Sequence, residues 1–278
     1  MKMIPREKIE QICAQLGGEV AVYASVTDTG EVYTRNADLQ MTAASTIKTP
    51  LLALLLWYAE QGKIDIDVKR RIAENNFATG SGILRSLSHD VEMNLFDIAV
   101  LMIVVSDNTA TNEVIDAVGM ETFNAAMAEL GYPKTSIGRK LCYRHYPAGT
   151  PGENLTCAAE LGRMMDLAVR GELLSPYVSR TLLQILAGQN LQKFTALIPA
   201  EGWKQPREPL PTPAEGSVLV ASKGGTLSGS RGISHDCAAF FLPDGRSYTL
   251  TVLTHTNDMI AARTAMAEIS LAMYEALR

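Results

Sequence analysis

The apolar run over residues 49–59 constrains the fold most strongly, because a helix built from it is apolar on nearly every face. Such a helix must be surrounded by other parts of the chain, so we expect it in the core. Residues 94–105 form a second run of this kind, which we predict as the central helix of a helical region. Neither run reaches the length of about 20 residues that crosses a membrane.

Ser45 and Lys48 stand immediately before the first of these runs. Serine is a favoured helix N-cap, so we expect Ser45 at or just inside a helix N-terminus, where free amides stabilise negative charge. Residues three apart lie on one face of a helix, which places the Lys48 ammonium near the Ser45 hydroxyl. The pair fits a nucleophile with its base, and equally a capping serine followed by a lysine whose stem covers apolar surface.

Length and composition narrow the classes of protein. The 278 residues, 47% of them hydrophobic, suffice for one large domain or two small ones. A net charge of −5 without a basic block argues against nucleic acid or an anionic membrane surface as the main partner. The first residues lack an apolar signal core, which predicts a cytoplasmic protein, or a periplasmic or secreted one if a signal has been removed.

Hydrophobic periodicity separates strands from helices along the chain. We expect a helical block over residues 60–188 between two groups of strands, with a loop over residues 139–154 and a surface insertion over residues 203–216. The predicted strands cover residues 19–26, 31–35, 217–222, 235–242 and 247–255, and the terminal helices cover residues 5–16 and 258–277.

Short turns between successive strands predict an antiparallel sheet, with the terminal helices packed on it. The fold class is therefore α+β, with an all-helical region inserted between the second and third strands. The expected α/β subdomain is discontinuous and comprises residues 1–44 and 189–278. Residues 45–188 form the expected helical subdomain, and the active site is expected in the cleft between the two.

Three short motifs occur in order: Ser45-x-x-Lys48, Ser106-Asp107-Asn108 and Lys223-Gly224-Gly225. Each alone has a structural explanation, since Ser106 and Asn108 could cap a helix and Lys223 could lie at an exposed strand end. The ordered set resembles the active-site signature of class A β-lactamases and penicillin-binding proteins. Residues 43–48, 106–112 and 229–233 carry the resemblance, which extends through most of the chain.

The resemblance implies the β-lactamase and transpeptidase fold and a set of catalytic residues. Ser45 matches the nucleophile that forms an acyl-enzyme, and the backbone amides of Ser45 and Thr226 match the oxyanion hole. Lys48 matches the general base, a role that requires a pKa lowered by burial and by a second cation, for which Lys223 is placed. Ser106 matches the hydroxyl that passes the proton to the leaving nitrogen.

The resemblance also implies how a substrate is held. Asn108 matches the side chain that orients Lys48 and the substrate amide, and Gly225 and Thr226 match substrate-contacting positions. Arg231 matches an anchor for a substrate carboxylate, although a surface turn explains it equally well. Gly224 departs from the family, which usually has threonine or serine there. The implied partner is a small molecule or peptide with a carboxylate, and no cofactor is implied.

The loop that follows the helical block departs from the family at its chemical centre. Arg139 matches the arginine that opens the loop, and on this register Leu141 stands where class A β-lactamases have a glutamate that activates water. A leucine cannot abstract a proton. His145 and Glu153 are alternative bases if the loop is folded differently, although His145 also fits an ordinary surface-loop histidine. The resemblance therefore implies slow hydrolysis of a β-lactam acyl-enzyme.

Cysteine and histidine spacing does not predict a metal site. The pairs Cys142-x-x-His145 and His235-x-Cys237 lack the matched spacing of zinc ligands. The four cysteines are widely scattered, so we expect buried free thiols at Cys13, Cys142, Cys157 and Cys237.

The resemblance implies a serine hydrolase that forms an acyl-enzyme at Ser45 with an amide or ester, such as a β-lactam or an acyl-D-Ala donor. A D-Ala-D-Ala-type peptidase or esterase is an alternative that fits the missing glutamate better. In those reactions the leaving group departs, so water can approach from the vacated side. A further alternative is a penicillin-binding or sensor module that is acylated without turnover.

Overall fold

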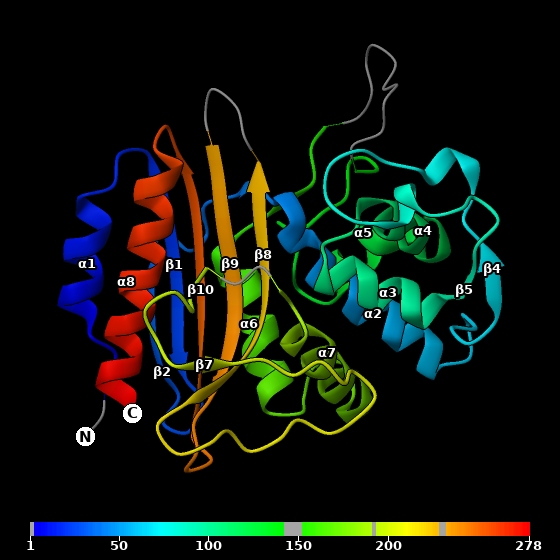
Figure 1. The fold of residues 1–278 in the computed structure, drawn as a ribbon. Helices are drawn as coiled ribbons and strands as arrows, with labels where there is room; N and C mark the ends of the chain where they lie inside the picture. The colour runs from blue at the N-terminus through cyan, green and yellow to red at the C-terminus, as the bar shows by residue number, and fades with distance from the viewer. Residues whose placement is uncertain (1–2, 142–151, 191–192, 228–231) are drawn as a thin grey trace.

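A six-stranded sheet forms the centre of the molecule, a computed structural model in which residues 3–141, 152–190, 193–227 and 232–278 are described (Figure 1). The strands lie in the order β2-β1-β10-β9-β8-β7, and neighbouring strands are antiparallel except β7 and β8. Their bounds are β1 Glu19–Val26, β2 Glu31–Arg35, β7 Ala200–Glu201, β8 Val218–Leu227, β9 Gly232–Phe241 and β10 Ser247–Thr256. The sheet is therefore mixed, which corrects the purely antiparallel prediction.

Both faces of the sheet are covered, and this explains why the central strands are buried along nearly their whole length. The terminal helices α1 Arg6–Ala14 and α8 Met259–Leu277 pack on one face, against side chains such as Val22 and Leu250. Helix α6 Ala158–Val169 packs on the other face, against Tyr23 and the alternate residues of the strands. The predicted α+β class and terminal helices are confirmed.

The helical region surrounds α2 Lys48–Glu60, which is buried on nearly every side as its composition requires. It packs against α3 Leu95–Val104, α4 Asn108–Val118 and α7 Pro176–Ala187. Helix α5 Met120–Glu129 follows α4 after Gly119, whose positive φ of 84° ends one helix and begins the next.

Two local predictions were wrong. Strand β8 does not end at residue 222; it continues to Leu227, because pairing with β9 extends through the glycines to the register Leu227↔Ile233. Residues 61–94 are mostly not helical, since aspartate, asparagine, serine and glycine favour turns there. They hold the β4 Lys69–Arg71 and β5 Glu92–Asn94 ribbon and the short 3₁₀ helices η2 Glu74–Asn76 and η3 Leu84–Ser86.

Ser45 lies just inside a helix N-terminus, as predicted, although its side chain is not the N-cap. It lies inside a 3₁₀ helix, η1 Ala44–Ile47, that runs directly into α2. The short strands β3 Met41–Thr42 and β6 Leu155–Thr156 pair just before it and join this segment to the far end of the 139–154 loop.

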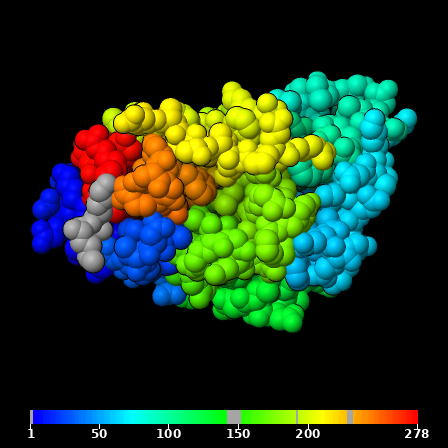
Figure 2. Space-filling view, turned by 90° about the horizontal axis from the view of Figure 1, so that it is seen from below, coloured from blue at the N-terminus to red at the C-terminus, as the bar shows by residue number. Residues whose placement is uncertain are grey.

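Residues 203–216 lie largely on the surface, and the yellow atoms of Figure 2 show this segment spread over the outside of the molecule. In the described part of the chain, no helix combines the length and apolar character that spanning a bilayer requires. The division into subdomains at residues 44 and 188 stays a prediction.

Candidate active site

Ser45 lies where β8 presses against the helical region. An added Cβ on Gly225 would stand 2.9 Å from the Ser45 backbone nitrogen and 3.1 Å from the Thr46 nitrogen. Only glycine therefore lets β8 approach the start of η1 this closely. The side chain of Ser45 remains partly exposed and faces two adjoining cavities.

Lys48 is fully buried, one helical turn after Ser45. Its Nζ donates to the Ser106 carbonyl at 2.7 Å, to Ser106 Oγ at 3.0 Å and to Asn108 Oδ1 at 3.0 Å. Three oxygen acceptors compensate for the loss of water around a buried ammonium. The first two predicted motifs are thus brought into direct contact, across 58 and 60 residues of sequence.

The turn between α3 and α4 presents two residues of the second motif, Ser106 and Asn108, to Lys48. Ser106 has a positive φ of 54°, and its neighbour Asp107 is the N-cap of α4, accepting from Ala110 N at 2.9 Å. Asp107 also accepts from the amides of Ile83 and Leu84. Since Asp107 is the residue that caps α4, the capping explanation for Ser106 and Asn108 is wrong.

Lys223 lies inside β8 and is buried, so the exposed strand-end explanation is also wrong. Its Nζ donates to Gln189 Oε1 at 2.7 Å and to the Gly224 carbonyl at 2.9 Å. Burial, together with the nearby charge of Lys193, lowers the pKa of Lys223 to about 7. Gln189 accepts from the Gly224 amide as well, and no sequence motif marks this residue.

The first cavity, of about 520 Å³, adjoins Ser45 on the side of Lys223. It contains the predicted Ser45, Ser106, Lys223 and Thr226, together with two cations that sequence reasoning missed, Lys193 and Arg263. The other lining residues are Ser81, Asn190, Ala196 and Gly224. Neither added cation belongs to a recognisable motif, because only the fold brings residues 193 and 263 together with residue 223.

The second cavity, of about 430 Å³, adjoins Ser45 on the side of the 139–154 loop. Asn108 and Thr226 line it together with Leu141 and Glu153. Leu141 therefore lies in the same cavity as the candidate nucleophile, as the register with class A β-lactamases predicts for the residue at that position. Nothing in its aliphatic side chain can accept a proton.

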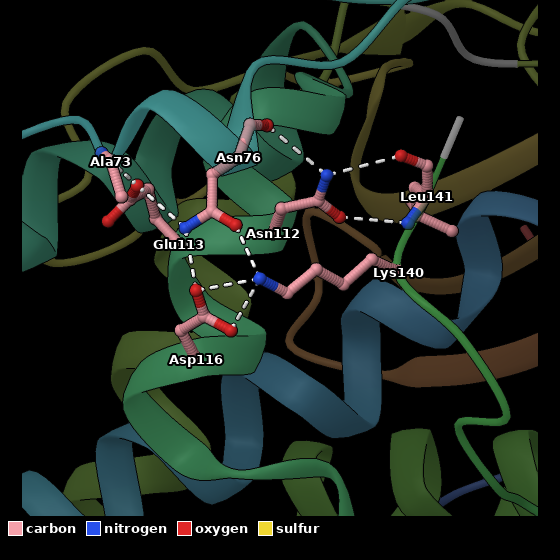
Figure 3. A network of polar contacts seen from close by, with 7 residues as sticks. All are labelled: Ala73, Asn76, Asn112, Glu113, Asp116, Lys140 and Leu141. Carbon is pink, nitrogen blue, oxygen red and sulfur yellow. Dashed lines mark hydrogen bonds and ion pairs between the residues drawn. The ribbon is translucent and has the colours of Figure 1, made fainter. Parts of the chain in front are cut away.

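The backbone of Leu141 is held from α4, as Figure 3 shows. Asn112 Oδ1 accepts from Leu141 N at 2.8 Å, and Asn112 Nδ2 donates to Leu141 O at 3.2 Å. Both bonds go to main-chain atoms, so they fix where residue 141 lies and are independent of its side chain.

A polar network next to Asn112 anchors the neighbouring Lys140 (Figure 3). Lys140 Nζ pairs with Asp116 at 2.7 Å and donates to Asn76 Oδ1 at 2.6 Å. Asn76 is fully buried and donates in turn to Asp116 and to Glu113. Helix α4 thus contacts Lys48 through Asn108, and it holds the start of the 139–154 loop through Asn112 and Asp116.

Of the two alternative bases, Glu153 and His145, the structure describes only Glu153. Glu153 is exposed, accepts from Thr42 Oγ1 at 2.6 Å and pairs with Arg139 at 3.4 Å, so its carboxylate already has partners. Asn154 accepts from the amides of Gly138 and Arg139 and closes the base of the loop. His145, Cys142 and Arg231, the residue expected to anchor a carboxylate, lie outside the described residues.

His235 and Cys237 do not form half of a metal site. His235 Nδ1 accepts from Thr254 N at 3.0 Å, and Nε2 lies 2.9 Å from the Thr42 carbonyl, so both ring nitrogens are engaged. Burial lowers the pKa of His235 to about 4, which keeps the ring neutral. Cys13, Cys157 and Cys237 are buried free thiols, as expected. No group of three metal-ligating side chains occurs among the described residues.

Comparison with curated proteins finds β-lactamases. FAR-1 of Nocardia farcinica is 25% identical over 269 residues, covering 95% of this chain and 80% of FAR-1. PSE-4 of Pseudomonas aeruginosa is 29% identical over 113 residues, covering 41% of this chain and 39% of PSE-4. The chain therefore spans about two fifths of the length of PSE-4 in that match.

Comparison with solved structures finds the same fold. A β-lactamase from Sphaerobacter thermophilus superposes with a TM-score of 0.80 at 25% identity, covering 96% of this chain and 94% of that one. PBP-A superposes with a TM-score of 0.78 at 22% identity, covering 98% of this chain and 97% of PBP-A. The family profile described as "Beta-lactamase enzyme family" matches residues 4–277. By sequence profile and by fold, this chain belongs to the β-lactamase enzyme family.

Proposed function

We propose that the chain forms an acyl-enzyme at Ser45 with an amide or ester donor, and that a β-lactam acyl-enzyme is hydrolysed slowly. The observation that carries this proposal is the contrast between Lys48 and Leu141. The buried Lys48 amine is held by Ser106 and Asn108 one turn from Ser45, whereas the loop residue facing the same serine is a leucine.

Acylation follows from the Lys48 arrangement. In its neutral form Lys48 accepts the Ser45 proton as Oγ attacks the donor carbonyl carbon, and the amides of Ser45 and Thr226 stabilise the oxyanion. The bond to the leaving nitrogen or oxygen then breaks, and the leaving atom takes a proton through Ser106, which contacts Lys48 Nζ at 3.0 Å. The product is an ester between Ser45 and the acyl group.

Deacylation needs a base for water on the acyl-enzyme. With a β-lactam, the opened ring stays attached and occupies the Ser106 side, and Leu141 offers no base on the opposite side. A solved structure of a leucine-to-glutamate variant of PBP-A holds an acyl-enzyme complex with penicillin G. That complex supports a penicillin acyl-enzyme as a state that this fold accommodates.

A D-Ala-D-Ala-type peptidase or esterase is the second candidate, favoured by the placement of Ser106 in the first cavity. When a peptide or ester leaving group departs, this side opens to water. Lys48 and Ser106 then serve hydrolysis by the same proton transfers in reverse order. The proposed partner is a small molecule or peptide that carries a carboxylate.

The test is intact-mass spectrometry after mixing the protein with penicillin G and, separately, with an acyl-D-Ala-D-Ala peptide and a phenyl ester. We expect a persistent adduct with penicillin G and product release with the peptide or ester. Ser45→Ala should form neither adduct nor product. An adduct of equal yield on Ser45→Ala would overturn the nucleophile assignment.

Rapid recovery of the unmodified mass with opened penicillin would instead make the chain an efficient β-lactamase. A persistent adduct with every donor and no product would favour the penicillin-binding or sensor alternative. These outcomes differ in mass and time course, so a single data set distinguishes them.

A further inference from the structure

The first cavity beside Ser45 is lined by three cationic side chains and by no acidic one in the described chain. Lys223 comes from β8, Lys193 from the segment after α7, and Arg263 from the first turns of α8. Three elements that are distant in sequence therefore direct positive charge into one space. Since the chain as a whole has a net charge of −5, general basicity does not explain this concentration.

Backbone and polar groups hold the two lysines without neutralising them. Lys193 Nζ donates to the carbonyls of Gly225 at 3.1 Å and His235 at 2.7 Å, and Lys223 Nζ donates to a glutamine and a carbonyl. All of these acceptors are uncharged, so no hydrogen-bond partner named here offsets the positive charge of either ammonium.

Asp236 is a carboxylate that acts electrostatically on both lysines, and it is not among the residues that line the cavity. It is completely buried, and its Oδ2 accepts from the backbone amide of Lys193 at 3.0 Å. Burial raises the pKa of Asp236, while burial and cationic neighbours lower the pKa of Lys193 and of Lys223. An anion in the cavity would relieve this repulsion between cations.

The cavity lies on the leaving-group side of Ser45, because Ser106, the residue placed to protonate the leaving atom, lines it. One carboxylate there, near Lys223 and Thr226, is what membership of the family leads one to expect. A single carboxylate offsets one positive charge and leaves the other side of the cavity cationic.

We infer that the natural acyl donor carries two anionic groups in its leaving group. The first binds at Lys223 and Thr226, and the second binds at Lys193 and Arg263, with the planar guanidinium suited to a bidentate carboxylate. This inference rests on the proposed acylation of Ser45. It narrows the substrate class to donors whose leaving group is a dicarboxylate, such as an acidic amino or hydroxy acid.

A matched pair of thioesters tests this directly. Hippuryl thioglycolate and hippuryl mercaptosuccinate share an acyl group and differ by one carboxylate in the leaving thiol, whose release gives the rate. We expect kcat/KM for the mercaptosuccinate ester to be about tenfold higher, because a charge-assisted bidentate pair contributes at least that factor. In Arg263→Gln this ratio should fall towards one, because kcat/KM for the mercaptosuccinate ester should fall more than kcat/KM for the thioglycolate ester.

Arg278→Gln, a change of the same charge at the far end of α8, is the control and should keep the full ratio. Equal kcat/KM for both thioesters in the unsubstituted protein would overturn the inference, and so would an equal loss for both in Arg263→Gln. Failure of either thioester to acylate Ser45 would instead contradict the proposed function, and therefore also the inference that rests on it. Adduct mass on Ser45 separates the two failures.

Discussion

The two sides of Ser45 are built in different ways. On one side Lys48, Ser106 and Asn108 are buried side chains whose own atoms make the contacts. On the other side Leu141 is held through its main-chain nitrogen and oxygen by Asn112. The first arrangement requires particular side chains, because their own atoms make the contacts. The second requires only that residue 141 has a main-chain nitrogen and oxygen, so it fixes the position of this residue and not its type.

This difference explains how residue 141 can be a leucine where the resemblance to class A β-lactamases leads one to expect a glutamate. A change at Lys48, Ser106 or Asn108 would leave buried polar groups without partners and disturb packing. A change at residue 141 leaves the Asn112 bonds intact, so glutamate, leucine or another residue can stand there without disturbing the hold on the loop. Under the proposed function, acylation is therefore constrained by the core, and deacylation is not.

The largest effect is expected when a residue on the buried side of Ser45 is replaced. Lys48→Met should lower the rate of Ser45 acylation by about a thousandfold, because general-base catalysis contributes about 10²–10⁴. Adduct formation followed by intact mass measures this rate. Lys134→Met, which removes an exposed lysine, is the control and should acylate normally. Equal acylation by both variants would contradict the role of Lys48.

The second prediction concerns a base introduced on the loop side of Ser45. Leu141→Glu should speed hydrolysis of the penicillin acyl-enzyme by about a hundredfold and leave acylation within a few-fold, because Asn112 already places this residue. The decay of adduct mass after removal of free penicillin measures the effect. Leu141→Gln is the control, because glutamine resembles glutamate in size and hydrogen-bonding capacity but cannot act as a base. A gain of the same size in Leu141→Gln would show that the effect is not base catalysis.

The third prediction weakens the anchor of the loop. Lys140→Met should cost about 2 kcal/mol of unfolding free energy, because it leaves Asp116 and the buried Asn76 without their charged donor. Urea unfolding followed by circular dichroism gives the value. Lys134→Met removes a more exposed ion pair and should cost clearly less. Equal costs would mean that the network in Figure 3 adds no stability beyond a surface pair.

The smallest effect concerns pH. Burial and the charge of Lys193 lower the pKa of Lys223 to about 7, so above pH 7 it loses the proton with which, under the proposed function, it binds a substrate carboxylate. KM for a carboxylate donor should therefore rise by up to about tenfold per pH unit above 7, whereas KM for the matching primary amide should not follow it. Lys193→Met removes a neighbouring charge and should move the rise to higher pH. A KM that is independent of pH between 6 and about 9 would contradict this account.

The sequence predicted most of the buried framework. The runs that became α2 and α3 are apolar on nearly every side, and alternation with valine identified β1 and β2 at their observed bounds. Residues 61–94 were harder, because short polar turns carry no periodicity and depend on contacts such as that between Asn76 and Glu113. The end of β8 depended on its pairing with β9, which local sequence does not encode.

The candidate site was predictable where it consists of motifs. The contacts of Lys48 join residues that the ordered motifs had already named. Gln189, Lys193 and Arg263 were not predictable, because isolated residues in an irregular segment or on an exposed helix face have no spacing that marks them. Their roles arise only when the fold brings three distant segments to one cavity.

The most direct test of the contrast between the two sides is a quenched time course of intact mass with excess penicillin G. We expect nearly all of the protein to be converted to the Ser45 adduct, followed by turnover at a much slower, constant rate. A protein that releases opened penicillin while its own mass stays unmodified would show that deacylation is as fast as acylation. That result would contradict the claim that the loop side of Ser45 lacks an effective base.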